Sequence, residues 1–222
     1  MKNFGKLKLI AAPLLLWGSV ANADIISAQV YADDDAFAAV TGAESLTGAL
    51  PDIDGGSGLT VTLGDATLTA DNTIFVGNTY TSDRNAIAIS GPENLDISID
   101  VGLATAFGFY FYEPTGNNTG VVDGCNATCV NSQFRISFLL GGVVIDQIGF
   151  IPSAEFPDQW FFGGLILDQA FDEVQFHEIV GGIDNEFFGE MYVARVPEPG
   201  TLALLGIGLV GVGFARRRKK AE

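Results

Sequence analysis

Phe107-Gly108-Phe109-Tyr110-Phe111-Tyr112 is the stretch that decides the fold of this chain. Side chains alternate between the two faces of a β-strand, so a strand here would carry aromatic rings on both faces, with Tyr110 and Tyr112 opposite Phe109 and Phe111. A strand that is apolar on both faces is typical of a sheet covered on both sides. We therefore expect residues 107–112 to form a central strand near the middle of the core.

Short strand patterns flank this stretch, and Gly, Asn and Asp residues separate them. Strict alternation predicts strands with one wet face over Leu59–Leu63 and Leu95–Val101. Phe134–Leu140 alternates again, and Gly141-Gly142 offers a two-residue turn into Val143–Ile145, which predicts a hairpin. Further strands are predicted over Trp160–Leu167, Phe171–His177 and Phe188–Val193.

Helical patterns are nearly absent from the sequence. Asp33-Asp34-Asp35 precedes Ala36–Val40, and acidic residues at that position favour one short helix with an aspartate cap. Many short strands separated by turn residues predict an all-β fold. We expect a two-sheet antiparallel β-sandwich of jelly-roll type.

The N-terminal residues 1–23 have the pattern of a secretory signal peptide. A short lysine-containing segment precedes the apolar run Leu9–Val20, and Ala21-Asn22-Ala23 supplies small residues before the cleavage point. We expect signal peptidase to cut between Ala23 and Asp24.

The C-terminal residues 201–215 form an apolar run, with Thr201 as its only polar residue. As a helix this run would be about 22 Å long, and flanking cations together with local thinning let so short a segment span a bilayer. Five cations follow, namely Arg216, Arg217, Arg218, Lys219 and Lys220. Such a cluster stays on the cytoplasmic side, so the body, residues 24–195, would face the periplasm.

Between the body and this run lies Val196-Pro197-Glu198-Pro199. The two prolines favour an extended strip, which suits a protease cleft. Together with the apolar helix and the basic cluster, residues 196–222 resemble the PEP-CTERM sorting signal. The resemblance implies recognition by an exosortase, a membrane-embedded transpeptidase-like protease of Gram-negative bacteria that make exopolysaccharide. A plain C-terminal membrane anchor, with the prolines as a rigid spacer, is the alternative.

The acidic residues are concentrated in the body. Residues 24–195 hold 25 of the 27 acidic residues and three of the 11 basic ones, which gives a net charge of −22. A surface so negative repels nucleic acid and anionic membrane, and it suits cations, basic proteins or neutral glycans. Solubility alone is the alternative explanation for this charge. A segment of this length predicts a single domain.

Both cysteines lie in Asp123–Cys129. In an exported protein two thiols so close together favour a disulfide over a metal site, so we expect a Cys125–Cys129 bond. A catalytic cysteine is disfavoured because the only histidine, His177, lies in an unrelated strand-like segment.

Catalysis is not the favoured function. A glycoside hydrolase needs two carboxyl groups at a set separation, and the loop candidates carry no local signature. These candidates are Glu113, Asp123, Asp158 and Glu186. No Gly-x-Ser-x-Gly elbow accompanies His177, and the lack of histidine and of a spare cysteine disfavours zinc. No catalytic residue is assigned.

Two kinds of ligand remain as hypotheses. A structural calcium ion would use carboxylate and loop oxygens from Asp33, Asp35, Asp184 and Asn185, with solvated acidic loops and a helix cap as the alternative. The segment from Phe171 to Asn185 also resembles the close of exported PEP-CTERM proteins with lectin-like sandwiches, which implies that Asp184 and Asn185 begin the approach to the last strand. A glycan would stack on Trp160 or Tyr112. No other cofactor is expected.

The sequence as a whole predicts an exported, non-catalytic β-sandwich protein of the cell surface or the exopolysaccharide matrix. Its expected partners are signal peptidase, an exosortase, the inner membrane and exopolysaccharide, and nucleic acid is excluded. Two alternatives stay open. A carbohydrate-binding module would show an exposed aromatic platform, and a secreted glycoside hydrolase would show two carboxylates that converge in a cleft.

Overall fold

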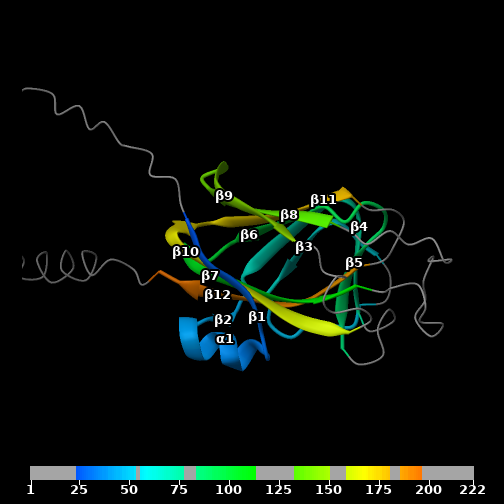
Figure 1. Ribbon diagram of the computed structural model, residues 1–222. Helices are drawn as coiled ribbons and strands as arrows, with labels where there is room; N and C mark the ends of the chain where they lie inside the picture. Colours follow the sequence, from blue (N-terminus) through cyan, green and yellow to red (C-terminus); the bar gives the residue numbers. More distant parts are fainter. Residues whose placement is uncertain are drawn as a thin grey trace, which may run out of the picture.

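A computed structural model describes residues 24–53, 56–77, 84–113, 133–150, 159–180 and 186–196. These residues form one short helix, α1 (Asp34–Thr41), and twelve strands (Figure 1). The strands are β1 (Ile25–Tyr31), β2 (Glu44–Ser45), β3 (Gly56–Leu63), β4 (Ala66–Gly77), β5 (Ala86–Ile89), β6 (Leu95–Ile99), β7 (Ala104–Tyr112), β8 (Gln133–Leu140), β9 (Val143–Phe150), β10 (Trp160–Phe171), β11 (Glu173–Val180) and β12 (Phe187–Arg195).

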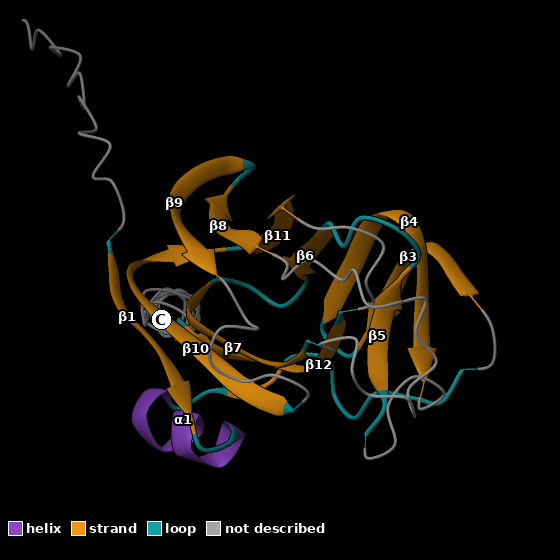
Figure 2. Ribbon diagram, turned by 45° about the vertical axis from the view of Figure 1, so that its right-hand side comes forward, coloured by secondary structure: helices purple, strands orange, loops and turns teal. Residues whose placement is uncertain are grey.

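All the strand pairs are antiparallel, and the strand order is β1-β10-β7-β12-β5-β4-β6-β11-β8-β9, with β2 on β12 and β3 on β4. The sheet folds back on itself, so that β10, β7 and β12 face β6, β11 and β8 across the core (Figure 2). Aromatic rings meet across this space: the ring centroids of Phe109 and Phe176 are 5.0 Å apart, and those of Phe111 and Phe134 are 5.6 Å apart.

The prediction of an antiparallel all-β fold is confirmed, but the two predicted sheets are one continuous sheet. The reason is the length of β4, which has 12 residues. Its first part, Ala66–Ala70, pairs with β6, and its last part, Ile74–Gly77, pairs with β5. One strand therefore carries the hydrogen bonding from one layer into the other. The jelly-roll connectivity stays a prediction.

The two ends of the sheet also meet, so the barrel is nearly closed. The Ile25 N–H group on β1 donates a hydrogen bond to Asp146 Oδ2 on β9, at 2.7 Å. Ile25 packs against the main core cluster together with Ile145, Ile148 and Phe150 of β9. A side chain, rather than a backbone ladder, thus joins the first and last strands of the order.

Strand β7 is central, as predicted. It lies between β10 and β12, and Phe107, Phe109 and Phe111 point into the main core. Its other face is covered by a second cluster that includes Phe37 of α1. The phenylalanines of residues 107–112 therefore fill the main core on one side of the sheet, while Tyr110 and Tyr112 join two smaller clusters on the other side.

Helix α1 confirms the predicted short helix and its cap. The Asp33 carboxylate accepts a hydrogen bond from the Ala36 N–H group at 2.8 Å, and Gly42, with φ of 71°, ends the helix by donating to Ala38 O. Phe37 is fully buried against the sheet, where Gly108 and Gly164 leave room for its ring. A Cβ atom at either glycine would come within 2.8 Å of that ring.

The other predicted strands are present, with shifted ends. Residues 59–63 lie within β3, the segment 95–101 ends as a strand at Ile99, and Phe171 closes β10 rather than opening β11. The predicted hairpin joins β8 to β9 through Gly141 (φ 59°) and Gly142 (φ 77°). The left-handed conformation of both residues explains why glycine occupies this turn.

Several predictions concern residues outside the described ranges. They are the signal peptide over 1–23, the Cys125–Cys129 disulfide, the calcium ligands Asp184 and Asn185, and the segment from Pro197 to Glu222. A membrane span would need a longer and more apolar helix than any found in the described ranges.

Candidate functional site

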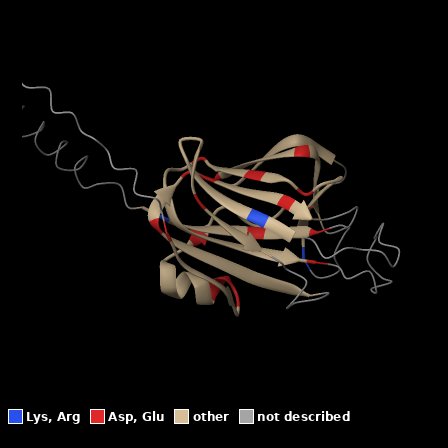
Figure 3. Cartoon of the chain, turned by 45° about the horizontal axis from the view of Figure 1, so that its top comes forward, with Lys and Arg blue, Asp and Glu red and all other residues tan. Residues whose placement is uncertain are grey.

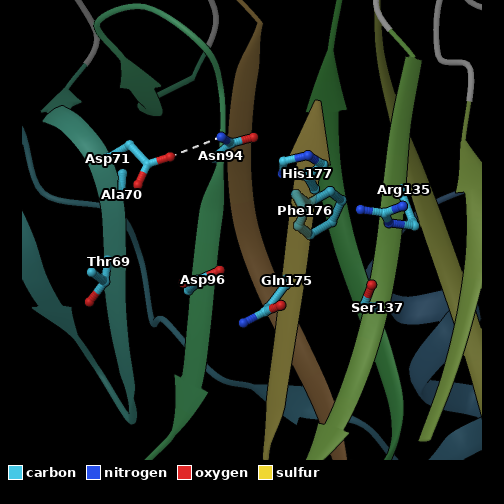
Figure 4. A pocket seen from close by; sticks show the side chains of 10 residues that line it. All are labelled: Thr69, Ala70, Asp71, Asn94, Asp96, Arg135, Ser137, Gln175, Phe176 and His177. Carbon is cyan, nitrogen blue, oxygen red and sulfur yellow. Dashed lines mark hydrogen bonds between the residues drawn. The ribbon is translucent and has the colours of Figure 1, made fainter. Parts of the chain in front are cut away.

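A polar pocket of about 280 Å³ lies on the outer face of the layer formed by β4, β6, β11 and β8 (Figure 4). Side chains on this face alternate with the core residues of the same strands, so the pocket stands directly behind the main core. The residues that line it are Thr69, Ala70, Asp71, Asn94, Asp96, Arg135, Ser137, Gln175, Phe176 and His177. The pocket surface is mainly hydrogen-bonding groups, since Phe176 is itself buried.

The strand register arranges these side chains in rows. Asp96 is paired with Thr69 on one side and Gln175 on the other, and Gln175 is paired with Ser137. In the neighbouring row, His177 is paired with Arg135. Carboxylates thus stand on the β4 and β6 side, while the guanidinium and imidazole stand on the β8 and β11 side.

Some of these groups are held by their neighbours. Asn94 Nδ2 donates to Asp71 Oδ2 at 2.9 Å, and Asn94 Oδ1 accepts from the Glu178 N–H group at 3.0 Å. Gln175 Nε2 donates to Glu173 Oε1 at 2.7 Å. These bonds fix Asp71, Asn94 and Gln175 at the rim and floor of the pocket.

Basic residues are few among the acidic ones along the described strands (Figure 3). Of the three in the body, Arg135 differs from the other two. Arg84 Nη1 pairs with Glu190 Oε2 at 3.3 Å, and Arg195 Nη2 pairs with Asp65 Oδ2 at 2.5 Å. Arg135 makes no ion pair within the described part of the chain. Its guanidinium is therefore available to a ligand in the pocket.

Asp96 lies in an acidic setting. Partial loss of water contact raises the pKa of its carboxyl group, and the carboxylates of Glu173 and Asp71 raise it further, against an opposite effect of His177. Asp96 is exposed to solvent on the pocket side. Its negative charge is therefore not stabilised by the fold around it.

A second polar and aromatic group lies on the outer face of β7, β10 and β12, beside α1. The Arg84 guanidinium carbon lies 3.7 Å from the centroid of the Tyr110 ring and 5.2 Å from that of Trp160. Tyr110 Oη donates to Asp34 Oδ1 at 2.7 Å. We call Arg84, Tyr110, Trp160, Glu190 and Asp34 the arginine–aromatic cluster.

Charge and burial shift the pKa values in this cluster. Burial tends to raise the pKa of Asp34, but hydrogen bonds from the Tyr110 and Tyr192 hydroxyls outweigh it, so that pKa lies below its usual range. Burial, together with the Asp34 carboxylate, raises the pKa of both tyrosines. The ionised carboxylate and the two neutral phenols therefore stabilise one another.

The predicted glycan residues, Trp160 and Tyr112, are neighbours on paired strands, with ring centroids 5.5 Å apart. Tyr112 is only 7% exposed and packs against Phe187, which corrects the prediction that it offers an open platform. Trp160 is partly exposed, and the Arg84 guanidinium lies over its ring. The register buries Tyr112 because residues from β5 and β12 complete its cluster.

The structure describes only two of the four residues predicted to bind calcium. Asp33 caps α1 and Asp35 is exposed in its first turn, and no group of three or more metal-ligating side chains occurs in the described ranges. Because Asp184 and Asn185 lie outside those ranges, the calcium site stays a prediction.

Glu113 and Glu186, two of the hydrolase candidates, are both buried. They adjoin the paired residues Tyr112 and Phe187, so the fold brings them to the same end of β7 and β12. Asp123 and Asp158 lie outside the described ranges.

The pocket itself was not predicted from the sequence. Asp96 and His177 each appeared only as an outward polar residue on a separate strand, and they are 81 positions apart in the chain. Their alternation with core residues showed which face they occupy. Only the pairing of β6 with β11 and of β11 with β8 placed them together with Arg135.

Comparison with known proteins gives one sequence match. Residues 195–219 match the PEP-CTERM protein-sorting motif, which confirms the resemblance drawn from the sequence. A search of curated proteins finds no match to the chain.

Comparison with solved structures gives several distant similarities. A mutant of the carbohydrate binding module CBM29-2 has a TM-score of 0.39 at 12% identity, covering 68% of this chain and 90% of that one. The K2 cleaved adhesin domain of Lys-gingipain has a TM-score of 0.41 at 12% identity, and the match covers 68% of this chain and 97% of that one. The C-terminal family 22 carbohydrate binding module of Clostridium thermocellum Xyn10B has a TM-score of 0.35 at 13% identity, and the match covers 65% of this chain and 96% of that one. All three TM-scores lie below 0.5, so the fold described above rests on the strand pairing of this chain.

Proposed function

We propose that this chain is an exported protein that an exosortase processes at its C-terminus, and that its β-sandwich body then serves at the cell surface or in the exopolysaccharide matrix without catalysing a reaction. The observation that carries the proposal is the motif match over residues 195–219. The match begins at Arg195, the last residue of β12. The sorting signal therefore follows the body without a separate linker.

The end of β12 is well anchored, which supports this arrangement. Arg195 pairs with Asp65, and the Val196 N–H group donates to Leu103 O at 2.8 Å. Four residues, 197–200, separate this anchored end from the apolar run that begins at Thr201. Four extended residues span at most about 14 Å, so before processing the body would be held close to the inner membrane.

Each part of the signal has a distinct role in the proposal. Pro197 and Pro199 keep the strip extended for the protease, and Glu198 between them gives it a recognisable charge. Residues 201–215 place the strip at the bilayer, and the cations at 216–220 keep the C-terminus cytoplasmic. Cleavage would then release the acidic body on the outer side.

The test is the intact mass of the protein recovered from the outside of its own cells. We expect a chain that begins at Asp24 and ends near Pro199. A Glu198→Ala variant should retain the C-terminal residues, whereas Glu222→Ala, which removes a carboxylate outside the motif, should be processed normally. A wild-type mass that includes residues 201–222 would contradict the proposal and identify the tail as a permanent anchor.

Two earlier predictions are tested with the same preparation. A Cys125–Cys129 disulfide would make the mass two hydrogens lighter than that of the reduced chain. A structural calcium ion at Asp33, Asp35, Asp184 and Asn185 would raise the thermal midpoint, and no shift at millimolar calcium would exclude it.

Glycoside hydrolysis is a second candidate that one observation favours. Asp71 and Asp96 line the same pocket, and the pKa of Asp96 is raised, as a general acid requires. The hydrogen bond from Asn94 to Asp71 and the exposure of Asp96 suit binding better than proton transfer. Release of reducing ends from exopolysaccharide by the wild-type protein, lost in Asp96→Asn, would establish the hydrolase instead.

A further inference from the structure

We infer that the polar pocket on β4, β6, β11 and β8 binds a neutral sugar residue through hydrogen bonds, with Asp96 and Arg135 as its principal contacts. Sugar hydroxyls both donate and accept, and neighbouring hydroxyls match the paired oxygens or nitrogens of planar polar groups. The pocket offers such groups from four adjacent strands (Figure 4). This site is separate from the arginine–aromatic cluster, which contains Trp160.

The central groups of the pocket are not used by the fold. Asp96, Arg135 and His177 form no side-chain hydrogen bond or ion pair within the described residues, although hydrogen bonds hold Asp71, Asn94 and Gln175 in place beside them. The rim of the pocket is held in place by internal hydrogen bonds, while the central donors and acceptors inside it have no partner within the described residues. Such a site is preorganised to bind a polar ligand.

The charges around the pocket favour a neutral ligand. An anion would meet Asp71, Asp96 and the nearby Glu173, and a simple cation would meet the Arg135 guanidinium. A neutral ligand that donates to the carboxylates and accepts from Arg135 satisfies both sides of the pocket. The pocket therefore selects for a polyhydroxylated molecule without net charge.

The size and the lining of the pocket also suit a small carbohydrate. A volume of about 280 Å³ is at the small end of ligand pockets, and it suits one or two sugar rings rather than a large aromatic molecule. Gln175, Ser137 and Thr69 add neutral hydrogen-bonding groups along one row. Most apolar side chains of the same strands face the core, so Ala70 and Phe176 alone among the lining residues are apolar, and the lining favours a polar ligand.

The ionised form of Asp96 is unfavourable for the stability of the fold. Partial burial raises the pKa of its carboxyl group, and repulsion by the carboxylates of Glu173 and Asp71 raises it further. Groups whose surroundings disfavour their charged form cluster at functional sites, because binding rather than folding makes use of the charge.

The inference rests on the residues of the body and stands whether or not an exosortase processes the tail. The experiment uses protein recovered from the outside of its cells and isothermal titration calorimetry with neutral monosaccharides, neutral disaccharides and the organism's own purified exopolysaccharide. Glycine, phosphate and calcium chloride serve as zwitterionic, anionic and cationic comparison ligands.

We expect at least one neutral carbohydrate to bind, and Asp96→Asn and Arg135→Gln each to weaken it by 10-fold or more, since each removes a charged hydrogen-bond partner. Glu44→Gln, which neutralises an exposed carboxylate on β2 outside the pocket, should bind as the wild type does. Circular dichroism and thermal midpoints establish that each variant is folded.

Three results would overturn the inference. One is the absence of binding to every neutral carbohydrate tested, and another is tighter binding of glycine, phosphate or calcium than of any sugar. The third is sugar binding that survives both pocket variants but is lost in Trp160→Ala, which would place the ligand at the arginine–aromatic cluster. None of these results depends on the mass measurement that tests the sorting proposal.

Discussion

Phe37 is the residue through which the helix depends on the sheet. Its ring occupies space that exists only because positions 108 and 164, on neighbouring strands, have no side chain. The rings of Tyr31 and Phe162 lie 5.1 Å and 5.5 Å from it, centroid to centroid. Glycine is needed at these two positions for close approach rather than for an unusual backbone angle.

A Gly164→Ala substitution tests this requirement. The new Cβ atom would lie 2.6 Å from Tyr31 Cε2 and 2.8 Å from Phe37 ring atoms. We therefore expect the free energy of unfolding to fall by about 1–3 kcal/mol, as for overpacking in other cores. Urea denaturation measures the loss. Gly149→Ala on β9 is the matched control, because a Cβ atom there meets nothing within 4 Å, and an equal loss in both variants would contradict the explanation.

Asp96 gives a prediction in which stability and binding move in opposite directions. A raised pKa in the folded state means that ionisation of Asp96 costs stability once the pH exceeds its ordinary value. Asp71 on β4, Glu173 and His177 on β11, and Arg135 on β8 are the charged or titratable groups around it. Asp96→Asn should therefore be slightly more stable at pH 7.

We expect the rise in melting temperature of Asp96→Asn to be at most about 2 °C, because the carboxylate is exposed and screened by water. Well below the ordinary aspartate pKa of about 3.9 the carboxyl group is protonated in both the folded and the unfolded chain, so the difference should disappear. Thermal melts at about pH 2.5 and at pH 7 measure both effects. A lower melting temperature at pH 7 would show that the carboxylate has a structural role.

At the scale of elements, two polar contacts attach α1 to β7. The Tyr110 hydroxyl donates to the Asp34 carboxylate, and the Asp34 N–H group donates weakly to the same hydroxyl oxygen, at 3.4 Å. The helix also packs Phe37 against the sheet. A helix of eight residues is too short to be stable alone, so these tertiary contacts maintain it.

Tyr110→Phe tests the polar contact while keeping the ring over which Arg84 lies. Loss of a hydrogen bond to an ionised group should cost about 1.5–3 kcal/mol at pH 7. Because the pKa of Asp34 is lowered in the folded state, its hydrogen bond with Tyr110 stabilises the fold fully above the ordinary aspartate pKa. This stabilisation is lost as the pH falls through the pKa of Asp34 in the folded state. The stability difference between Tyr110→Phe and the wild type should therefore shrink in acid.

Urea denaturation at pH 7 and at pH 3 measures the deficit of Tyr110→Phe. Tyr31→Phe is the control, since the buried Tyr31 hydroxyl has no hydrogen-bond partner in the described ranges, and its removal should be neutral or slightly stabilising. A deficit that is the same at both pH values would mean that the Asp34 charge is not involved.

At the scale of the whole molecule, the sheet is closed by a side chain. Asp146 bridges β9 to the Ile25 N–H group of β1, so the two edge strands are joined at one point. Unpaired edges favour association between chains, and closing them is one way in which β proteins stay monomeric. The net charge of the body adds repulsion between copies.

Asp146→Ala should open this closure. We expect faster hydrogen exchange at the Ile25 amide, with little change at Gly163 or Gly164, which remain within the β10 to β7 pairing. Asp168→Ala is the matched control, because the Asp168 carboxylate accepts from Asp24 N at 2.8 Å but does not join β1 to β9. Unchanged exchange at Ile25 would show that packing alone closes the barrel.

The sequence by itself determined which residues form strands, which faces of them are buried, the short capped helix, the glycine hairpin and the sorting motif. Each of these is encoded locally, by alternation of apolar residues, by a cap within four residues, or by a contiguous run. The segment from Phe107 to Tyr112 was recognisable as a central strand for that reason.

Only the tertiary structure decided that the sheet is continuous through β4, that Tyr112 is buried, and that Asp96, Arg135 and His177 share one pocket. Strand order and register determine these features, and they depend on pairings between residues far apart in the chain. Alternation tells which side of a strand a residue faces, but it does not tell which strand lies next to it.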